Sequence, residues 1–588
     1  MFQKIKRILK SLREYKVYAI ITPFFMIGEV VMECILPSVM SDLLNTLELG
    51  DNIVPYIIAM VIIAVFSLIF GILGGLTASK ASAGLAKNLR YDMYKKIQSF
   101  SFANIDRFSV SSLVTRLTTD VSTVQMAFQM CIRAVVRAPL MMIFSTVMAF
   151  VKGGVLAFIF VALIPVIGLV FFLILRKAMP TFSLLFKRYD AMNESIKENV
   201  SAIRVVKSYV REDYERAKFK ATSDSLAKDF IKVEKIVAWN MPALNFAIHL
   251  SNILICSFGS YLIYSGSTYD PKLDAIISTK LSLGEMSALQ TYGVQILMSL
   301  MFVSMILVML AMSIEGMIRI DEVLVEEPTI KDPENPIYVI DDGSVVFKNV
   351  NFKYNENAEK NAIEDMNFSI KSGEFVGIIG STGSGKTSLV NLISRLYDAT
   401  TGEVLVGGKN VKEYDLKALR DSVSVVLQKN VLFSGTIAEN LRWGDLNATD
   451  DEVRNAAKIA QADEFVQTFP LKYDTYIEQG GSNVSGGQKQ RLCIARALLK
   501  KPKILILDDS TSAVDTKTDK LIRESLRKDI PNTTKIVIAQ RISSIEDADK
   551  IIVLDNGRIN AIGTHEQLVE NNAIYRDIYL TQTKKGEN

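Results

Sequence analysis

The stretch EFVGIIGSTGSGKTSLVNLISRLY, residues 374–397, decides the fold of the C-terminal part of this chain. An apolar run leads into a loop rich in glycine, and residues spaced as on an amphipathic helix follow. A strand, a glycine-rich loop and a helix in this order form the context that the phosphate-loop pattern requires. The glycines let backbone N–H groups point at phosphates, and the helix N-terminus adds positive potential. The sequence therefore predicts a nucleotide-binding α/β domain.

Two side chains of this loop have predicted roles in binding a nucleotide and its magnesium ion. Lys386 reaches the terminal phosphates, and the hydroxyl of Thr387 ligates magnesium. The residues expected to surround the phosphates are Gly380, Ser381, Thr382, Gly383, Ser384, Gly385, Lys386, Thr387 and Ser388.

A second motif, ILILDDSTSAVD at residues 504–515, supplies the other half of the predicted site. Its apolar residues form a buried strand that delivers Asp508 to the magnesium ion, as the second carboxylate of phosphate-loop nucleotidases does. Gln428, after the apolar run SVSVVL, could reach the same ion through its amide oxygen or could be an ordinary polar residue at a strand end. Tyr354 could stack on adenine or could be an edge aromatic of a sheet.

The segment NVSGGQKQRLCIARALL, residues 483–499, opens with a hydroxyl, two glycines and an amide and then becomes helical. Such a start resembles another anion-binding helix N-terminus. A simple helix cap at Ser485 would explain it equally well.

Apolar runs long enough to cross a bilayer as helices all lie before residue 316. The predicted spans cover residues 17–36, 55–77, 136–152, 154–176, 236–265 and 285–314. The loop at 37–54 has acidic residues without Lys or Arg, whereas the segment at 80–137 is rich in both. The positive-inside rule therefore places the first outside and the second in the cytoplasm. Both chain termini are then cytoplasmic, and we expect a multi-pass protein of the cell membrane.

The N-terminal residues MFQKIKRILKSLREYKV, 1–17, alternate basic and apolar side chains at helical spacing. We expect an amphipathic helix on the cytoplasmic face of the membrane. A mitochondrial presequence is the alternative, but Glu14 and the lack of a serine-rich stretch disfavour it.

Charge and cysteine patterns exclude other classes of protein. From residue 344 onward 33 Lys and Arg balance 33 Asp and Glu, so the net charge of +4 belongs to residues 1–343 and no nucleic-acid surface is implied. The four cysteines are scattered, without metal-ligand spacing and without a disulfide framework.

The same motifs, in this order behind six predicted spans, resemble those of ATP-binding cassette exporter half-transporters. They are the phosphate loop, Gln428, VSGGQ, ILILD, SAVD and the late IVIAQR. Two further stretches, FSVSSLVTRLTTDVSTVQ at 108–125 and ENVSAIRVVKSYVREDYERAKF at 198–219, are similar to that family's intracellular loops with their coupling helices. The resemblance covers essentially the whole chain.

This resemblance implies a fold class and a division of the chain. We expect an interfacial helix at 1–17, an α-helical six-span transmembrane domain with long cytoplasmic helical extensions at 18–320, and a linker at 321–343. An α/β phosphate-loop ATPase domain with a helical subdomain follows at 344–588.

The resemblance also implies ATP and Mg²⁺ as cofactors and a dimer of two half-transporters. Each ATP lies between the phosphate loop of one chain and the signature segment of the other, so one chain contributes to two sites. Two segments of this chain are expected to contact the ATP bound by the partner. They are the signature residues Ser485, Gly486, Gly487 and Gln488 and the D-loop residues Ser512, Ala513, Val514 and Asp515.

Two departures from the family's pattern fall on one site. The family usually has glutamate at the position of Asp509 and histidine at that of Gln540. Aspartate is one methylene shorter, which withdraws its carboxylate by about 1.5 Å, and a displacement of about 1 Å in a catalytic group can cost on the order of 100-fold in rate. Glutamine cannot take the positive charge of an imidazolium. We expect tight ATP binding and slow hydrolysis at this chain's own phosphate loop.

Polar residues inside predicted spans are candidates for the substrate pathway. Glu29 and Glu33, one turn apart in the first span, could attract cationic amphiphiles, or Glu33 could be solvated near the outer interface. Asn245, His249 and Asn252 share one face of the fifth span, which suits a water-filled cavity or hydrogen bonds between helices.

Methionines follow one another on one face of the last span, at Met298, Met301, Met305 and Met309. Flexible thioethers suit a surface that accepts many apolar shapes, although packing against a neighbouring helix or lipid would need the same residues.

The sequence and its resemblance thus predict an ATP-driven multidrug exporter subunit that works with a homologous half-transporter, membrane lipids and small amphipathic substrates. Its heterodimeric partner would carry the missing glutamate and histidine. The alternatives are a homodimer in which Asp509 is a slower base, a lipid flippase, an exporter of one endogenous compound, and a nucleotide-gated regulator without transport.

Overall fold

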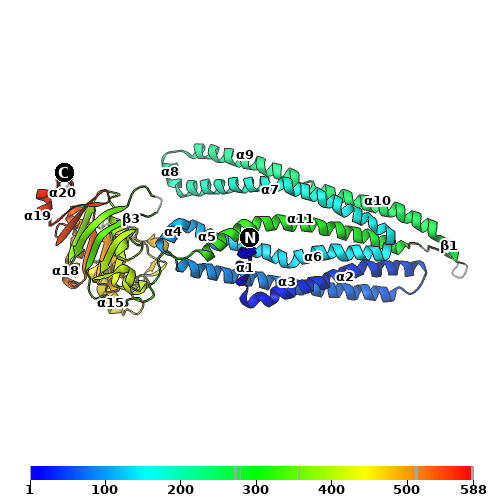
Figure 1. The fold of residues 1–588 in the computed structure, drawn as a ribbon, viewed down its shortest axis with the longest axis horizontal. Helices are drawn as coiled ribbons and strands as arrows, with labels where there is room; N and C mark the ends of the chain where they lie inside the picture. The colour runs from blue at the N-terminus through cyan, green and yellow to red at the C-terminus, as the bar shows by residue number, and fades with distance from the viewer. Residues whose placement is uncertain (1, 271–274, 279, 356–357, 510–513, 585–588) are drawn as a thin grey trace. The chain divides into compact units, whose positions relative to one another are not determined.

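The computed structural model describes residues 2–270, 275–278, 280–355, 358–509 and 514–584. The chain divides into two compact units, both drawn in Figure 1. The helical unit comprises Met1–Gln98 and Ser109–Glu326, and the sheet unit comprises Ser99–Phe108 and Glu327–Asn588. The sequence patterns did not anticipate that Ser99–Phe108, which lies within the predicted transmembrane domain, joins the sheet unit. The boundaries predicted at 1–17, 18–320, 321–343 and 344–588 stay predictions.

The helical unit consists mainly of helices longer than the roughly 20 residues that a bilayer crossing needs. In chain order these elements are α1 Phe2–Lys10, α2 Lys16–Glu48, α3 Val54–Gln98, α5 Val110–Thr115, α6 Val121–Gly153, α7 Phe158–Ser201, α8 Ile203–Ser208, α9 Glu212–Val237, α10 Asn240–Gly266 and α11 Leu283–Val325. Figure 1 shows α2, α3, α6 and α11 side by side, while α7 and α9 form a hairpin with α8 at its tip. A short antiparallel pair, β1 Ser267–Asp270 and β2 Ala275–Ser278, lies between α10 and α11.

The outward faces of α2, α3, α6, α7, α10 and α11 carry many apolar side chains. Leu68 on α3, Val151 on α6 and Phe246 on α10 are all exposed in the isolated chain. Among the described residues five segments are long and apolar enough to cross a membrane: Arg13–Glu48, Val54–Gln98, Val110–Thr181, Glu212–Gly266 and Leu283–Val325. An apolar surface of this extent requires lipid, so the helical unit is a multi-pass membrane domain.

The five segments differ from the six predicted spans at one place. The third segment, 72 residues long, includes both 136–152 and 154–176. Between them α6 ends at Gly153, Gly154 adopts a φ of +50°, and a short 3₁₀ turn, Gly154–Ala157, leads into α7. Only glycine adopts such a backbone conformation without strain. The chain reverses its direction at this turn, as Figure 1 shows.

Helix α2 continues to Glu48, well past the end of the first predicted span at residue 36. Near its end Asp42 accepts a hydrogen bond of 2.6 Å from the amine of Lys152, close to the end of α6. The pattern of apolar residues did not predict this extension, because the last three turns of α2 carry polar side chains, of which Asp42 contacts α6 and Asn45 contacts the start of α11.

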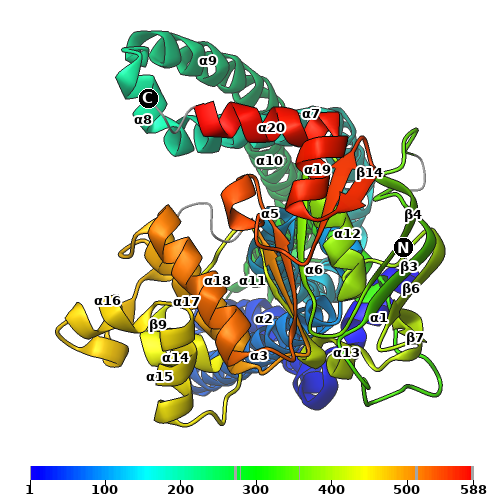
Figure 2. The ribbon, with the colours of Figure 1, turned by 90° about the vertical axis from the view of Figure 1, so that its left-hand side faces the viewer.

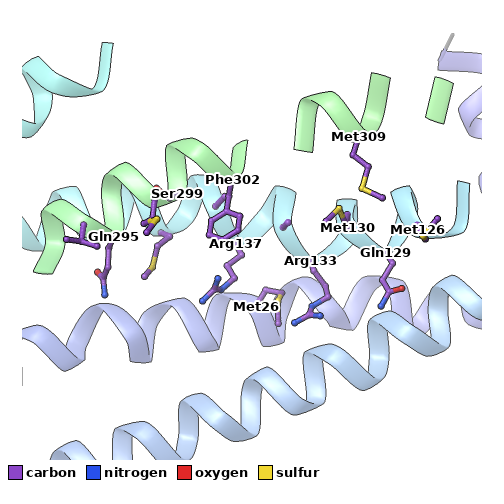
Figure 3. A pocket seen from close by; sticks show the side chains of 15 residues that line it. Met26, Met126, Gln129, Met130, Arg133, Arg137, Gln295, Ser299, Phe302 and Met309 are labelled. Carbon is purple, nitrogen blue, oxygen red and sulfur yellow. The ribbon is translucent and has the colours of Figure 1, made fainter. Parts of the chain in front are cut away.

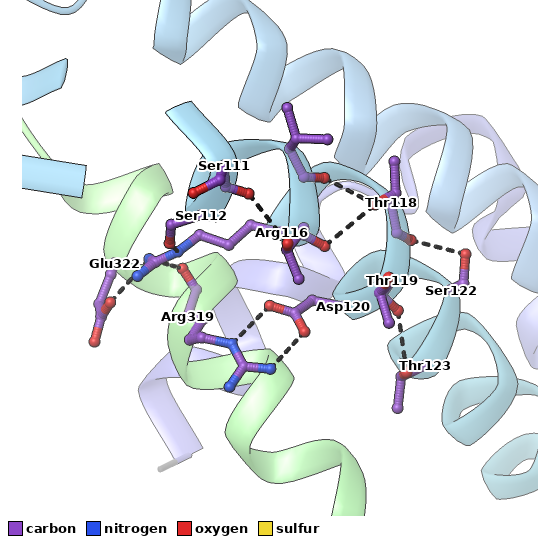
Figure 4. A network of polar contacts seen from close by, with 12 residues as sticks. Ser111, Ser112, Arg116, Thr118, Thr119, Asp120, Ser122, Thr123, Arg319 and Glu322 are labelled. Atoms are coloured by element: carbon purple, nitrogen blue, oxygen red, sulfur yellow. Dashed lines mark hydrogen bonds and ion pairs between the residues drawn. The ribbon is translucent and has the colours of Figure 1, made fainter. Parts of the chain in front are cut away.

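The predicted intracellular loop at 108–125 is fixed to the end of α11 by an arginine–carboxylate network, drawn in Figure 4. A π-helical turn, Arg116–Asp120, joins α5 to α6. The buried carboxylate of Asp120 accepts two hydrogen bonds from the Arg319 guanidinium, at 2.8 and 2.6 Å. Arg116 donates to the backbone carbonyl of Arg319 at 2.6 Å and to Glu322 at 2.9 Å. Bidentate geometry of this kind compensates a carboxylate for the loss of water.

The sheet unit contains a mixed six-stranded sheet in the order β14-β13-β5-β12-β11-β8. Its strands are β5 Phe375–Gly380, β8 Val423–Val426, β11 Ile504–Asp508, β12 Thr534–Ile538, β13 Lys550–Asp555 and β14 Arg558–Gly563. Only β14 is antiparallel to its neighbour. The parallel strands are nearly all buried, which explains their continuous apolar runs. Because β5 and β11 are parallel, their carboxyl ends meet at one edge of the sheet.

A second, antiparallel sheet of four strands packs in the same unit, in the order β4-β3-β6-β7. Its strands are β3 Val345–Phe352, β4 Ile363–Ile370, β6 Thr401–Val406 and β7 Lys409–Asn410. The helices of the unit are α12 Lys386–Ile393, α13 Leu416–Ser422, α14 Ile437–Arg442, α15 Asp450–Ile459, α16 Asp463–Thr468, α17 Gly486–Leu499, α18 Thr516–Asp529, α19 His565–Asn571 and α20 Ala573–Lys584. Figure 2 shows α14 to α17 gathered together, with α19 and α20 at another side of the sheet.

A short helix from the first third of the chain, α4 Phe102–Phe108, completes the sheet unit. Asp106 accepts a hydrogen bond from the hydroxyl of Tyr397. The buried side chain of Asn104 donates to the carbonyl of Glu327 at 3.0 Å and accepts from the N–H of Thr329 at 3.2 Å. These contacts explain why residues 99–108 belong to this unit.

Candidate nucleotide site

The loop after β5 has the backbone of a phosphate cradle. Gly383 and Gly385 have φ angles of +84° and +94°, which favour glycine. A Cβ added to Gly380 would lie 2.2 Å from the carbonyl oxygen of Leu554, so that position has no room for a side chain. The residues predicted from 380 to 388 thus form the turn and the first part of α12, and the cradle fits a phosphate group.

The amine of Lys386 lies over this loop. It donates hydrogen bonds to the carbonyls of Gly380 at 2.9 Å and Ser381 at 2.7 Å. Burial lowers the pKa of Lys386, while the charges of Asp508 and Asp509 oppose that shift. Ser384 and Ser388 are buried beneath the loop, so their side chains support the cradle rather than face its cavity.

The predicted magnesium ligands meet at the end of β11. The hydroxyl of Thr387 donates to the buried carboxylate of Asp508 at 2.9 Å. Burial raises the pKa of Asp508, against the effect of this hydrogen bond. A hydroxyl and a carboxylate oxygen, with the Gln428 amide in the same cavity of about 480 Å³, form the hard oxygen donor set that suits Mg²⁺.

Asp509 and Gln540, the two residues that depart from the family pattern, are in direct contact. The side-chain amide of Gln540 donates to the Asp509 carboxylate at 2.7 Å, and Gln428 makes a second hydrogen bond to the same group. The backbone of Asp509 has a φ of +49°, and its N–H donates to the carbonyl of Ile538 at 3.0 Å. Burial raises the pKa of Asp509, although both side-chain hydrogen bonds oppose the shift.

The C-terminal helix α20 forms one wall of the cavity, which the sequence reading missed. Ile574, Asp577 and Ile578 line it, together with Asp555 from β13. The side chain of Gln582 donates to the carbonyl of Gln540 at 2.8 Å and accepts from the N–H of Ile542 at 2.8 Å. The signal available in the sequence was the helical spacing of Ile574, Ile578 and Gln582 after the last strand.

Tyr354 lies just after β3 and is about half exposed, at 49%. Its hydroxyl is 2.9 Å from that of Ser388, and its ring contacts Phe352 and Tyr397 at centroid distances of 4.8 and 5.1 Å. Tyr354 therefore stands next to the phosphate loop with an accessible ring, although it does not line the phosphate cavity described above.

The predicted signature segment begins helix α17. The backbone N–H of Gln488 donates to the Ser485 hydroxyl at 3.3 Å, and the N–H of Ser485 donates to the Gln488 side chain at 2.9 Å. This reciprocal cap explains both residues locally, and the exposed Gly486 and the partly buried Gly487 belong to the first turn. None of the four signature residues is among the described residues that line the phosphate cavity.

The D-loop prediction is described only in part. Ser512 and Ala513 lie outside the described residues. Val514 is buried in the core of the sheet unit, and Asp515 caps α18 by accepting from the N–H of Thr518 at 2.9 Å. That hydrogen bond lowers the pKa of Asp515.

The candidate pathway residues of the helical unit are not brought together. Glu29 and Glu33 both form ion pairs with Arg137. Asn245 and His249 are exposed on α10, and Asn252 is partly exposed. The methionines of α11 divide, because Met298 and Met309 line a cavity, Met301 packs against neighbouring helices, and Met305 is exposed.

Comparisons with known proteins agree with this architecture. Residues 19–300 match the family model described as ABC transporter transmembrane region, and residues 363–512 match the model described as ABC transporter. The chain is 34% identical over 588 residues, 98% of each chain, to the ABC transporter ATP-binding protein YfiB of Bacillus subtilis. It is 35% identical over 510 residues to the ABC transporter ATP-binding protein Rv1273c of Mycobacterium tuberculosis, covering 86% of this chain and 85% of that one.

A solved structure shares the fold over nearly the whole length. The structure of a bacterial Atm1-family ABC exporter with ATP bound has a TM-score of 0.80 at 23% identity, covering 97% of this chain and 98% of that one. The matched domains, the phosphate cradle and the donor set for magnesium imply an ATPase that is coupled to transport and uses ATP with Mg²⁺. The chain therefore belongs to the ATP-binding cassette transporter family, as an exporter half-transporter in which a helical transmembrane domain is fused to an ATPase domain.

Proposed function

We propose that this chain is one half of a heterodimeric exporter of amphipathic small molecules in the cell membrane. Its own phosphate loop binds ATP and hydrolyses it slowly, while its signature segment completes the fast site of a partner half-transporter. The observation that carries this proposal is the 2.7 Å hydrogen bond from the neutral Gln540 amide to the shortened acid Asp509.

The contact matters because of the protonation that hydrolysis requires. A general base must reach the attacking water and accept its proton, and the groups around it must stabilise the charge that develops. The Asp509 carboxylate is already occupied by two amides, from Gln428 and Gln540. Gln540 cannot become cationic beside the phosphates. This site therefore binds ATP tightly and hydrolyses it slowly.

The placement of the signature segment supports a partner chain. Ser485 to Gln488 form a helix start whose first two residues are exposed, and none of the four is among the described residues that line the phosphate cavity. In our proposal this N-terminus meets the ATP of the partner, where its N–H groups and dipole favour phosphate.

Two exposed surfaces of the helical unit also favour a partner. Asn245 and His249 are exposed on a helix whose opposite face, with Leu244 and Ala247, is buried. Polar side chains in a membrane helix seldom face lipid. Helix α8 has no buried residue, and its neighbour Tyr209 is 74% exposed. We assign both surfaces to contacts with the partner half-transporter.

We further propose six membrane crossings with both termini in the cytoplasm. The reversal at Gly153 and Gly154 divides the 72-residue segment into two crossings, which supports the count. The end of α2 with the residues that follow it up to 54, and the turn at 154, would then lie outside, consistent with the hydrogen bond between Asp42 and Lys152 near both. The parts 18–320, 321–343 and 344–588 serve as pathway, linker and motor.

The proposal is tested with a complex in which the phosphate-loop lysine of the partner is replaced, so that all turnover comes from this chain's loop. We expect weak ATPase activity for wild type and for Asp509→Glu, and a gain on the order of 100-fold for Asp509→Glu with Gln540→His, since reach and charge are then both restored. Binding of the fluorescent nucleotide TNP-ATP should be equal in all three.

The control is Asp508→Asn in the double variant, which removes a magnesium ligand and should cancel the gain. Brisk hydrolysis by the purified wild-type chain alone would contradict the heterodimer and favour a homodimer with Asp509 as its base. A full gain from Asp509→Glu alone would show that Gln540 does not limit the reaction.

A further inference from the structure

A cavity of about 540 Å³ lies within the helical unit, among α2, α6 and α11 (Figure 3). Its apolar lining is dominated by thioethers, from Met26, Met126, Met130, Met141, Met298 and Met309. Methionine side chains adapt to irregular apolar shapes at low cost. The cavity is therefore suited to the apolar body of a small molecule.

The acidic residues near this cavity are occupied. The guanidinium of Arg137 donates to both carboxylate oxygens of Glu33, at 2.7 and 2.8 Å, and lies 3.6 Å from Glu29. Neither glutamate is among the described residues that line the cavity, whereas Arg137 is. Glu29 and Glu33 thus hold an arginine in place, and the expectation that they attract a cationic amphiphile is not supported by these contacts.

The amides of the cavity are likewise bound to neighbouring helices. Gln295 accepts from the hydroxyl of Ser145 at 2.9 Å and donates to the backbone carbonyl of Glu33 at 3.2 Å. Gln129 accepts from the hydroxyl of Ser82 at 3.5 Å. These hydrogen bonds hold α6 and α11 against their neighbours, while the NH2 group of Gln129 remains available to a ligand.

Arg133 is different. It lies one helical turn before Arg137 on α6, and Figure 3 shows it near the middle of the cavity, with Met26 between the two arginines. In the part of the chain that the structure describes, no carboxylate lies within ion-pair distance of its guanidinium. Glu29 interacts electrostatically with Arg133, but from beyond ion-pair distance.

The position of Arg133 along the helix places its guanidinium near one boundary of the hydrocarbon core. It is 20 residues before Gly153, where α6 ends, which corresponds to roughly 30 Å along a helix and to about the thickness of the hydrocarbon core. A guanidinium near that boundary gains strongly from a bidentate anion such as a carboxylate, sulfonate or phosphate.

From these contacts we propose that the cavity binds amphipathic anions, with the acidic group of the ligand on Arg133 and its apolar body among the methionines. The inference rests on the proposed export function and names its substrate class. Arg133 sets the preference for charge, and the pair of Arg137 with Glu29 and Glu33 keeps the acidic residues away from the ligand.

The test uses two probes that differ only in their charged end: dansyl-taurine, a sulfonate, and dansyl-ethylenediamine, an amine. Binding to the purified full-length chain in phosphatidylcholine nanodiscs is followed by dansyl fluorescence. We expect the sulfonate to bind at least about tenfold tighter than the amine, which corresponds to one charge-assisted pair. Arg133→Gln should remove the preference, and Arg133→Lys should retain part of it. Binding of TNP-ATP reports that each variant is folded.

Equal or tighter binding of the amine to wild type overturns the inference, and so does an unchanged preference in Arg133→Gln. Loss of sulfonate binding when phosphatidylglycerol is added to the nanodiscs also overturns it, because the occupant would then be an anionic lipid. The proposed function is judged separately, by ATP-dependent movement of dansyl-taurine in vesicles that contain the heterodimer. Absence of transport with Arg133-dependent binding intact contradicts the export proposal, while the binding of the anion at Arg133 still stands.

Discussion

The phosphate cavity and the membrane cavity of this chain are built in opposite ways. The first is assembled from loops at the ends of neighbouring strands, where backbone conformations such as those of Gly383 and Gly385 fix the geometry. The second is assembled from side chains of α2, α6 and α11, which are far apart in sequence and are held by ion pairs such as Arg137 with Glu33. A site fixed by its backbone can be predicted from local motifs, whereas a site fixed by pairing between helices cannot.

The largest effect that this comparison predicts is in the nucleotide half of the molecule. Ser485→Ala should lower the ATPase activity of the heterodimer on the order of 100-fold, the usual cost of losing a hydrogen-bond donor at a developing charge. The reason is that the Ser485 hydroxyl would donate a hydrogen bond to the ATP at the partner's phosphate loop. Steady-state phosphate release measures the ATPase activity.

Thr449→Ala is the matched control, because Thr449 caps α15 with the same reciprocal pattern, through Glu452. Loss of either cap should cost about 1 kcal/mol of stability. An equal loss of turnover in both variants would mean that Ser485 acts only as a helix cap.

The second prediction concerns the pairing in the membrane half. Arg137→Gln leaves Glu29 and Glu33 without a cationic partner at membrane depth. We expect a loss of about 2 kcal/mol in stability, less than the roughly 3–5 kcal/mol for a fully buried pair because the Arg137 side chain is 35% exposed. Thermal unfolding of the chain in nanodiscs measures it.

Arg133→Gln is the control on the same helix and should change the unfolding temperature little, since it breaks no ion pair. Adding Glu29→Gln and Glu33→Gln to Arg137→Gln should recover most of the loss. If the single and the triple variants unfold at the same temperature, the ion pairs do not fix this region.

These two halves also differ in how far the sequence predicts them. The phosphate loop, Asp508 and the placement of Asp509 and Gln540 at one site follow from short motifs, because strand ends and tight turns restrict where such side chains can lie, whereas the hydrogen bond between Asp509 and Gln540 is seen only in the structure. The roles assigned to the site residues stay predictions. Glu29 and Glu33 are different, since nothing in their local sequence indicates that Arg137, more than 100 residues later, occupies them.

Helix α20 lies between these extremes. Its helical spacing is visible in the sequence, but its contact with the loop at 540–542 depends on how the last strand, β14, returns the chain to the sheet. Ser99–Phe108 joined the sheet unit for a similar reason, because the hydrogen bonds of Asn104 and Asp106 are made with residues 327–397. Long-range contacts of this kind have no signature in a local window.

The third prediction uses that helix. Gln582→Ala removes two hydrogen bonds of 2.8 Å to the loop that carries Gln540, worth about 1 kcal/mol together. We expect ATP to dissociate from this chain's loop roughly fivefold faster, because 1 kcal/mol corresponds to about that factor. Stopped-flow displacement of TNP-ATP measures the rate.

The neighbouring variant Thr583→Ala is the control, since the Thr583 hydroxyl donates only within α20, to the carbonyl of Tyr579 at 2.9 Å. A rate that changes equally in both variants would assign the effect to the helix as a whole rather than to the Gln582 contact.

The smallest predicted effect separates the two cavities by pH. Burial raises the pKa of Asp508 above the ordinary value for aspartate of about 3.9. The carboxylate must be ionised to bind Mg²⁺, so protons compete with the metal at a higher pH than at an exposed aspartate. Lys386 and the hydroxyl of Thr387 face the same carboxylate and favour its ionised form, while Asp509 disfavours it.

We therefore expect the Mg²⁺ dependence of TNP-ATP binding to weaken by a few fold as the pH falls through the range just above 3.9. A sulfonate stays ionised over that range, so the affinity of the membrane cavity for dansyl-taurine should change less than the Mg²⁺ dependence does. Parallel titrations of both probes on one preparation make the comparison, and a dansyl-taurine affinity that falls together with the Mg²⁺ dependence would contradict the separate electrostatic control of the two cavities.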